Sequence, residues 1–365
     1  MSSAASVSFL REAVAIDSTE DVEPMRRFLV ETLEAAELPV AVDPAGTVCA
    51  QRGSADASTH LLLNTHLDTV PPHIPPRWDP QTETLHGRGS ADAKGPLAAM
   101  VDAFCTARLP ADARVTLAVT TDEEADSRGA AALDVGQTMA IVGEPTDLTL
   151  ATAARGRFVA TVRLEGTAGH AATPAECVNP AEAVGPAVSA IHAMDADGPT
   201  DPLLGAPIAT VTQISAGGPA NQVPAVVELT VDRRSIPPET ATAFEHQLQG
   251  AVTAAVPQAV AVSTSLAARP TPFLEAFRTP SSARVVRLLR DAADAVGVDP
   301  ELTAFAAATE ASYFAATPVV VFGPGRLADA AGPIAHADRE YVHTPAVETA
   351  AAMLRQTIES LGSGS

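Results

Sequence analysis

Histidine and carboxylate side chains that could bind a metal ion or transfer a proton stand at the ends of apolar segments of this sequence. The first pair is His66 and Asp68, which follow the run Leu61–Leu63. Three consecutive leucines bounded by polar residues predict a short strand buried on both faces of a parallel sheet. Residues two apart on an extended chain point to the same side. Asp68 could therefore hold one imidazole nitrogen of His66 and leave the other facing outward, as in many metal sites.

The interpretation of His66 depends on residues further along the chain, because His-x-Asp alone is more typical of a loop histidine beside a solubilising acid. A β-branched run over residues 114–121 ends in Glu123 and Glu124, and a shorter apolar run ends in Glu144. Asp92 comes just before a segment that predicts a helix. Sites in open α/β sheets assemble at the carboxyl ends of strands, so these coincidences favour one shared site.

The candidate ligands combine imidazole and carboxylate groups, which suit zinc and other borderline divalent ions. Two dications bring four positive charges, which three carboxylates and a bridging hydroxide would offset. Such a pair makes hydroxide available near neutral pH and polarises a carbonyl group, as amide hydrolysis requires. Glu123 adjoins a candidate ligand and could pass a proton from water to the leaving amine. The candidate ligands are His66, Asp92, Glu124, Glu144 and His336.

Other catalytic motifs are absent or weak in this sequence. It contains no His-Glu-x-x-His, the motif of a single-zinc helix site, and no Gly-x-Ser-x-Gly elbow of a serine hydrolase. Residues 323–328, GPGRLA, formally match the dinucleotide fingerprint. Pro324 lacks the N–H that such a turn would offer, so nucleotide binding is disfavoured.

The composition is typical of a soluble globular protein with an acidic surface. The chain has 365 residues, of which 46% are hydrophobic and 18% charged, and its formal net charge is −21. This length exceeds that at which a single core usually keeps growing, so two domains are expected. The acidity disfavours nucleic acids and anionic membrane surfaces as partners, although solubility alone explains most of the carboxylates.

Cysteine usage and the apolar runs favour a cytoplasmic location. Cys49, Cys105 and Cys177 are few and widely spaced, which fits core thiols in a reducing cytosol better than disulfides or a zinc ribbon. Charged residues interrupt the apolar residues near the N-terminus, so no signal-peptide core is expected. No apolar run approaches the ~20 residues of a membrane span.

Both helices and strands are predicted around the candidate residues, but the pattern of apolar and polar residues changes in the middle of the chain. From about residue 155, alternating apolar and polar positions indicate half-exposed antiparallel strands in the order β-α-β-β-α-β. We therefore expect a split domain, residues 1–154 and 271–365, and an inserted α+β domain, residues 155–270, with one open sheet face. That face suits a dimer contact, although charges could equally protect it. Helices are predicted near 6–15, 22–36, 180–194, 238–255 and 280–296, and from Gly95 and Ala346.

The motifs, taken in order, resemble those of the M20 family of co-catalytic dizinc peptidases and deacylases. HLDTV, GRGSADAKG, TTDEE, VGEP and AHADREYV carry the resemblance, which covers nearly the whole chain. It implies an α/β fold in which a mixed-sheet, zinc-peptidase-like catalytic domain holds an inserted ferredoxin-like dimerisation domain. It also implies two divalent metal ions, zinc or alternatively cobalt, and a homodimer formed through the inserted domain.

The resemblance assigns each candidate ligand to a metal ion. His66 and Glu144 would bind one zinc ion, and Glu124 and His336 would bind the other. Asp92 would bridge the two ions.

The resemblance also implies roles for neighbours of these ligands. Glu123 would be the general acid and base, and Asp68 would orient His66. The family often has a cis peptide bond after the bridging aspartate, which is here the bond between Asp92 and Ala93.

Residues of the inserted domain would complete the site by the same resemblance. GTAGHAATP resembles the segment whose histidine reaches into the neighbouring subunit, so His170 would stabilise the oxyanion across a dimer; from the residues alone, a turn histidine is preferred. Asn221 and Arg234 would bind the substrate, while Arg233 would face the other side of its strand. An arginine can bind both oxygens of a carboxylate, but Arg234 could instead be a solvated charge on a strand.

Two departures from the family concern the substrate pocket. Ser312 stands where several relatives carry an arginine that recognises the substrate, and the segment 326–335 is longer than in close relatives. The remaining histidines match no ligand motif and are expected to be structural or exposed; they are His60, His73, His86, His192, His246 and His343.

The sequence thus predicts metal-dependent hydrolysis of the amide bond of an N-acyl amino acid, a small-molecule substrate. A deacetylase of the acetylornithine or acetyl-lysine kind is preferred. A succinyl-diaminopimelate desuccinylase and a carboxypeptidase or dipeptidase of the same family are the alternatives. A non-catalytic dimeric binding protein is the alternative from another class, but such a relative should have lost ligands, and here all the ligand types and the acid–base residue are present.

Overall fold

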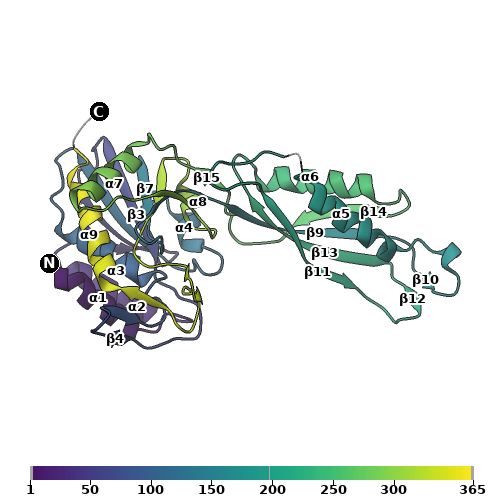
Figure 1. Ribbon diagram of the computed structural model, residues 1–365, viewed down its shortest axis with the longest axis horizontal. Helices are drawn as coiled ribbons and strands as arrows, with labels where there is room; N and C mark the ends of the chain where they lie inside the picture. The colour runs from purple at the N-terminus through teal and green to yellow at the C-terminus, as the bar shows by residue number, and fades with distance from the viewer. Residues whose placement is uncertain (1–2, 197, 363–365) are drawn as a thin grey trace. The chain divides into compact units, whose positions relative to one another are not determined.

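The computed structural model describes residues 3–196 and 198–362, and the chain forms two compact units (Figure 1). The first unit contains the chain up to Ala153, then Arg278–Phe305 and the chain from Thr309. The second unit contains Ala154–Phe277 with Ala306–Ala308. Within the described ranges, no helix combines the length and the apolar character needed to cross a membrane.

A mixed β-sheet forms the centre of the first unit (Figure 1). Its strands are β1 (Val40–Val42), β2 (Val48–Gly53), β3 (Thr59–His66), β6 (Ala113–Thr120), β7 (Met139–Val142), β8 (Leu150–Ala154), β15 (Phe277–Arg278), β16 (Leu302–Phe305) and β17 (Val319–Val321). They lie in the order β1-β2-β6-β3-β7-β17-β8-β15, with β16 beside β8. β3 is parallel to both neighbours and all its residues are buried, which explains its unbroken leucine run. The predicted α/β class with a mixed sheet is confirmed.

Helices pack on this sheet and on one another to complete the core of the first unit. They are α1 (Ser3–Ala15), α2 (Glu23–Ala35), α3 (Lys94–Thr106), α4 (Arg128–Ala132), α7 (Arg284–Ala295), α8 (Ala311–Phe314) and α9 (Thr344–Glu359). α3 contacts α1, α9, β3 and β6, and α7 contacts α9, β7 and β17. α7 buries Val285, Val286, Leu288 and Leu289, the helical spacing that produces one apolar stripe.

A small antiparallel sheet joins two loops of the first unit that are distant in sequence. Its strands are β4 (Arg77–Asp79), β5 (Thr84–His86) and β20 (Tyr341–His343), in the order β20-β5-β4. Beside this sheet, the N–H of Gly87 donates to the carbonyl of Glu340 at 3.1 Å. The segment that follows β5 therefore runs beside the segment that precedes β20. The loop before β20 holds a hairpin of β18 (Ala328–Asp329) and β19 (Gly332–Pro333).

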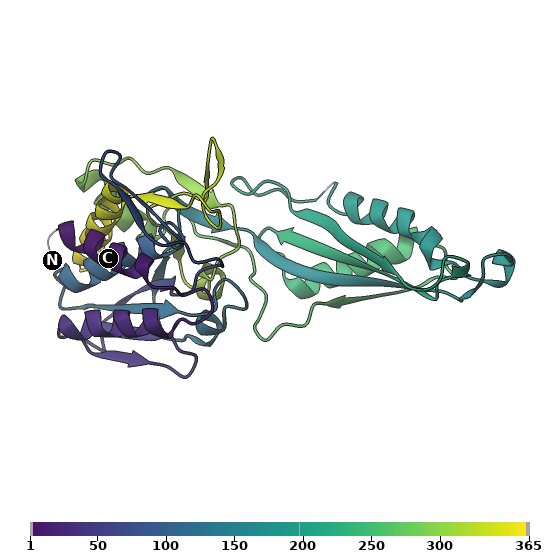
Figure 2. The same ribbon diagram turned by 90° about the horizontal axis from the view of Figure 1, so that it is seen from below.

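The second unit contains an antiparallel sheet with helices α5 and α6 on one face (Figures 1 and 2). Its elements are β9 (Gly156–Glu165), β10 (Gly169–His170), α5 (Val184–Ala193), β11 (Ile208–Ala216), β12 (Gln222–Val223), β13 (Val226–Ser235), α6 (Ala241–Ala255) and β14 (Ala261–Leu266). The main sheet has the order β11-β13-β9-β14. Alternate residues of β9 and β13 are buried against the helices, as the alternating pattern predicted. The α+β class of the insertion is confirmed, and its dimerising role stays a prediction.

Two predicted helices of the second unit begin later than expected. Residues 180–183 form a 3₁₀ turn before α5. The helix expected from residue 238 begins at Ala241, because the hydroxyl of Thr240 accepts the N–H of Ala243 at 3.2 Å. A threonine in that position caps a helix and so fixes its first turn.

Candidate metal centre

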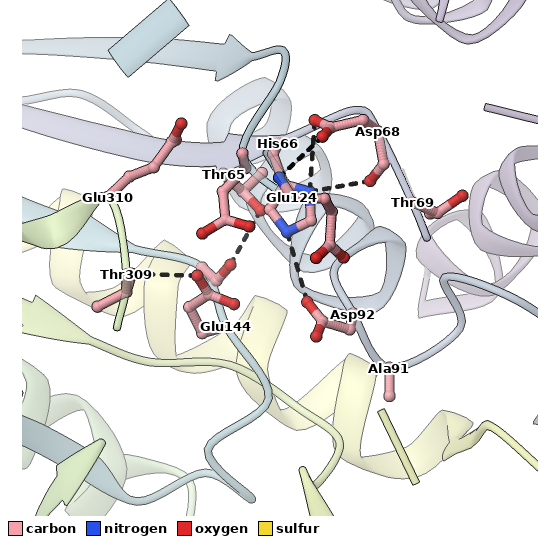
Figure 3. A network of polar contacts seen from close by, with 12 residues as sticks. Thr65, His66, Asp68, Thr69, Ala91, Asp92, Glu124, Glu144, Thr309 and Glu310 are labelled. Carbon is pink, nitrogen blue, oxygen red and sulfur yellow. Dashed lines mark hydrogen bonds and ion pairs between the residues drawn. The ribbon is translucent and has the colours of Figure 1, made fainter. Parts of the chain in front are cut away.

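The candidate ligands gather where neighbouring strands of the first unit end (Figure 3). His66 is the last residue of β3, which lies between β6 and β7 and runs parallel to both. Glu124 follows β6 and Glu144 follows β7. Asp92 lies two residues before α3. Because parallel strands end at one edge of the sheet, side chains from four segments meet there.

Asp92 faces two histidines with its two carboxylate oxygens. Oδ1 lies 3.4 Å from Nε2 of His66, and Oδ2 lies 3.3 Å from Nε2 of His336. Nε2 of His336 also lies 3.1 Å from Oε1 of Glu124. One ligand atom from each of His66, Asp92 and Glu124 falls within 4.8 Å of the others. This geometry, one oxygen toward each histidine, is what a carboxylate that bridges two ions requires.

Main-chain and side-chain oxygens of Asp68 orient two of these residues. Nδ1 of His66 donates to the main-chain carbonyl of Asp68 at 2.9 Å, whereas the carboxylate oxygen Oδ1 lies at 3.8 Å. The predicted contact with the carboxylate is therefore replaced by one with the carbonyl. The carboxylate has another task, because Oδ2 accepts the N–H of Glu124 at 3.0 Å. Asp68 thus holds both a histidine and the main chain of a candidate ligand.

His66 provides a test of whether the residues fit a metal ion. A carbonyl can only accept, so Nδ1 carries the proton, and Nε2 of the neutral ring offers a lone pair. Nε2 is buried and has no hydrogen-bond partner among the described residues. It points toward Asp92, which also offers lone pairs (Figure 3). Two acceptors that face each other in a buried place need a proton or a metal ion between them, and this set of donor atoms fits a divalent ion.

The charges of the cluster lead to the same conclusion. Burial opposes a charged His66, but Asp92 and other nearby carboxylates outweigh it and raise the pKa of this imidazole well above its ordinary value. The hydrogen bonds with Asp92 and Glu124 raise the pKa of His336 to about 10. Burial raises the pKa of Asp92, but its contacts with the two histidines outweigh burial and lower it. The carboxylates of this cluster thus favour positive charge on both histidines, and they would stabilise an added cation in the same way.

Glu144 and Glu123 lie near this group, but they are not among the three residues whose ligand atoms lie closest together. The hydroxyl of Thr309 donates to Oε1 of Glu144 at 3.0 Å, and Glu144 is 4% exposed. Burial and neighbouring acids, Asp92 first among them, raise its pKa well above the ordinary range. Burial also raises the pKa of Glu123. The nearby His66 lowers this pKa, whereas the nearby Glu144 raises it further. A carboxyl group with a raised pKa can both hold and release a proton near neutral pH.

The peptide bond between Asp92 and Ala93 is cis, as the resemblance implied.

Of the candidates in the second unit, His170 and Asn221 lie together, whereas Arg234 lies at the other end of β13. His170 is exposed on β10, and the N–H of Ala171 donates to the carbonyl of Asn221 at 3.0 Å. Nδ1 of His170 accepts the N–H of Ala172 at 3.1 Å, so the neutral ring carries its proton on Nε2, which is free to donate. The cluster in the first unit is built without these residues.

The two arginines of β13 lie on opposite faces of their strand. Arg234 is half-exposed, and its Nε donates to Asp232 at 2.7 Å. Arg233 is buried under the helices and forms ion pairs with Asp195 and Glu239. The prediction that Arg233 faces away from the open face is confirmed, and the substrate role of Arg234 stays a prediction.

Buried charged residues that the sequence reasoning passed over lie beside the candidate ligands. Glu310, next to Thr309, is buried, and burial raises its pKa to about 8. The hydroxyl of Thr120 lies 2.6 Å from Glu310 and 3.0 Å from the carbonyl of Thr65. A hydroxyl has one proton, so a protonated Glu310 satisfies both contacts. The sequence feature that could have identified Glu310 is its acidic side chain in the segment TEASYF, residues 309–314.

Arg88 and Glu340 also escaped the sequence reasoning, although both stand inside the quoted motifs. They form a buried ion pair with a separation of 2.7 Å. The sequence feature that could have identified them is a charged residue within each of the motifs GRGSADAKG and AHADREYV.

The structure locates three further segments that the sequence singled out. A Cβ on Gly323 would lie 2.5 Å from the carbonyl of Glu144, so the glycine of GPGRLA allows close packing beside a candidate ligand. The segment 326–335 contains the hairpin of β18 and β19, where Tyr341 and Arg339 both donate to Asp329. Ser312 lies on α8.

Comparisons with known proteins connect this geometry to a family. The model of peptidase family M20/M25/M40 matches residues 62–360. A protein of Pyrobaculum aerophilum with the provisional name LysW-lysine/LysW-ornithine hydrolase is 31% identical over 346 residues, which is 93% of this chain and 92% of that protein. Acetylornithine deacetylase of Edwardsiella ictaluri is 29% identical over 331 residues, which is 82% of this chain and 79% of the enzyme.

A solved structure with a similar fold is the YXEP protein of Bacillus subtilis, described as a dinuclear metal-binding peptidase of the M20 family. The two structures have a TM-score of 0.72 at 13% sequence identity, over 98% of this chain and 97% of that chain. At such low identity, the likeness concerns the fold alone. The match of the family model over most of the sequence goes further: this chain belongs to the M20/M25/M40 family of peptidases.

Proposed function

We propose that this protein is a metal-dependent amidohydrolase that cleaves the amide bond of N-acyl amino acids. The observation that carries the proposal is the position of Asp92, which turns one carboxylate oxygen toward each of two histidines. A bridging carboxylate between two sets of ligands is the arrangement of a two-metal hydrolytic site. Relatives named for acetylornithine and for LysW-lysine and LysW-ornithine support a substrate with an amino-acid leaving group.

Two divalent ions, zinc in the first instance and cobalt as a substitute, are proposed to bind this cluster. His66 and Glu144 would hold one ion, Glu124 and His336 the other, and Asp92 both. Bound ions of this kind lower the pKa of water and polarise a carbonyl oxygen. The Nε2 of His66, which has no hydrogen-bond partner among the described residues, and the nearby carboxylates that favour positive charge at this ring support this fit.

Glu123 is proposed to transfer protons beside the metal ions. It follows β6 next to Glu124, and its carboxyl pKa is raised by burial and by neighbouring acids. Such a group can take a proton from the attacking water and return it to the leaving nitrogen. His170 is proposed to donate from Nε2 to the oxyanion, because its Nδ1 is occupied by the N–H of Ala172.

The substrate carboxylate is proposed to bind to the second unit. Arg234 is half-exposed on the open face of β13, where its guanidinium can reach a ligand. Asn221 lies on the turn beside His170. An acetyl group on an ornithine or lysine is the preferred acyl substituent, and a succinyl group or a dipeptide is the alternative.

A homodimer in the cytoplasm is proposed as the working form. The edge strand β11 carries Ile208, 48% exposed, and Ile214, 54% exposed. Exposed apolar side chains on an edge strand favour pairing with a second chain.

A hydrolysis screen tests the proposed function. The metal-free protein, and the same protein with added Zn²⁺ or Co²⁺, would be offered N-acetylornithine, N-acetyl-lysine, N-succinyl-diaminopimelate and dipeptides. We expect metal-dependent release of a free amine, fastest with the acetylated amino acids. Metal binding without turnover of any of these would contradict the proposal and favour a non-catalytic binding protein.

A further inference from the structure

Arg88 and Glu340 form an ion pair deep inside the first unit, between two loops that carry candidate ligands. Nη1 of Arg88 lies 2.7 Å from Oε2 of Glu340, and each side chain is 1% exposed. Burying two charges costs several kcal/mol per ion, and an apolar pair of similar size is often as stable or more stable. Stability alone therefore does not account for a pair at this depth, so its other contacts are informative.

The second carboxylate oxygen of Glu340 holds the main chain at Asp92. Oε1 accepts the N–H of Ala91 at 3.0 Å and the N–H of Asp92 at 3.1 Å. These two donors lie in the turn before α3, which has no other side-chain cap. Glu340 itself follows His336 by four residues in the chain. One carboxylate thus ties the turn that carries Asp92 to the loop that carries His336.

The other donors of Arg88 hold the loops on either side. Nη1 donates to the carbonyl of Ala337 at 3.2 Å, and Nη2 donates to that of His336 at 3.4 Å. Nε donates to the carbonyl of Pro72 at 3.2 Å, in the loop that follows Asp68. The planar guanidinium has five N–H groups in a fixed geometry, so it fixes the relative positions of all three loops.

His336 makes such a restraint necessary. Its φ is +63°, a left-handed conformation that residues other than glycine seldom adopt. Surrounding contacts must hold a residue in that conformation. The carbonyls of His336 and Ala337 are both acceptors of Arg88, which supplies this restraint.

We propose that Arg88 and Glu340 are positioning residues that set the spacing between Asp92 and His336 in the candidate metal centre. They act through main-chain groups, and their contacts on Asp92 and His336 are with the backbone. The inference rests on the proposed function, because it presupposes that metal ions bind between these ligands. It predicts that loss of the pair changes the metal site even when the fold persists.

The test uses a variant that lacks the pair without leaving a buried charge unpaired. In the double variant Arg88→Met/Glu340→Leu, apolar side chains of similar size replace both ions, so the protein should fold. Circular dichroism and thermal melting of the metal-free protein check the fold. Affinity for Co²⁺, measured by competition with a chelator, and the visible absorption of bound Co²⁺ report on the site. We expect affinity to fall by about 10–100-fold, the effect of removing outer partners of ligands, and the spectrum to change.

A matched control removes the other buried arginine. Arg233 pairs with Asp195 and Glu239 in the second unit, so the variant Arg233→Met/Asp195→Asn/Glu239→Gln also loses a buried ion pair. We expect its melting temperature to change while its Co²⁺ affinity and spectrum stay those of the wild type. Equal losses of Co²⁺ affinity in the control and in the double variant would overturn the positioning role.

A second variant decides the matter if the double variant fails to fold. Glu340→Gln keeps the shape of the side chain and one acceptor oxygen but removes the charge, so it should fold, with a smaller loss of Co²⁺ affinity and a shifted spectrum. A wild-type affinity and spectrum in every folded variant would overturn this inference alone. A wild-type protein that binds no Co²⁺ would overturn both the inference and the proposed function.

Discussion

At the scale of single residues, the candidate centre depends on residues that contact more than one partner. Asp92 presents separate oxygens to His66 and His336. Asp68 uses its carbonyl for His66 and its carboxylate for the main chain of Glu124. A substitution at such a residue disturbs two contacts at once, so its effects should not add simply with those at its neighbours.

Glu123→Gln tests proton transfer without removing a ligand. The amide has the size of the carboxyl group but cannot exchange a proton, so kcat should fall by about 10²–10⁴-fold. The metal content, measured by mass spectrometry or absorption, should stay that of the wild type. Glu31→Gln, an exposed glutamate on α2, is the control with unchanged turnover. Near-normal turnover in Glu123→Gln would refute the assigned role.

The thiols give a prediction that is independent of the metal. Burial raises the pKa of both Cys49 and Cys105 to about 11, from an ordinary value of 9.0. The reactive thiolate should therefore be about 100-fold scarcer than in the unfolded chain at pH 8. We expect correspondingly slow alkylation by iodoacetamide at pH 8, and faster reaction as the pH rises toward 11. Mass spectrometry of tryptic peptides, with the urea-unfolded protein as reference, measures it; equal rates in both states would contradict the prediction.

At the scale of elements, β3 fixes the position of the centre. It pairs along its whole length with β6 and over Leu61–Asn64 with β7, and it ends in His66. The hydroxyl of Thr65 donates to the carbonyl of Gly143 at 2.9 Å, so the ends of β3 and β7 are also joined by a side chain. A central strand with two partners and no exposed residue has little freedom to shift its register.

Leu62→Ala should show how much stability this strand contributes. Leu62 is 0% exposed, and truncation of a fully buried leucine costs about 2–5 kcal/mol in free energy of unfolding. Val42 on β1 is 47% exposed, so Val42→Ala should cost about 0.5 kcal/mol or less. Urea denaturation of the metal-free protein followed by circular dichroism measures both values. Equal values for the two variants would show that β3 does not form the core.

The sequence predicted the local features of this fold well because their causes are local. The leucine run predicted a strand buried on both faces, and the alternation after residue 155 predicted half-exposed strands. The meeting of His66 and Glu124 followed from the rule on strand ends, and that of Asp92 with them from its place before a predicted helix. Beyond that, the sequence carries no direct sign of pairing between distant segments. The contact of Arg88 with Glu340, and the pairing of β5 with β20, join residues about 250 positions apart.

At the scale of the whole molecule, the candidate site residues are divided between the two units. The candidate ligands belong to the first unit, whereas His170, Asn221 and Arg234 belong to the second. If His170 acts across a dimer, as the family resemblance implies, each complete site needs two chains.

Mixing two inactive variants tests this directly. His170→Ala lacks the oxyanion donor and Glu123→Gln lacks the proton-transfer group, so each homodimer should be nearly inactive. A mixed dimer would contain one site with both residues intact, and random exchange of subunits would restore about a quarter of wild-type activity. Activity is measured after mixing and mild dissociation of the chains. No recovery despite demonstrated subunit exchange would place His170 in the same chain as its site.

The insertion between the two parts of the first unit also affects the order in which the centre can form during synthesis. Glu144 precedes the second unit and His336 follows it, with roughly 190 residues between them. At about 5–20 residues per second, the ribosome needs about 10–40 s to span that interval. Over that time the candidate site is incomplete, because the N–H groups of Ala91 and Asp92 lack their acceptor, the carboxylate of Glu340. A chain released before His336 and Glu340 are made would lack part of the candidate site, so the proposed binding of metal ions would come among the last events of folding.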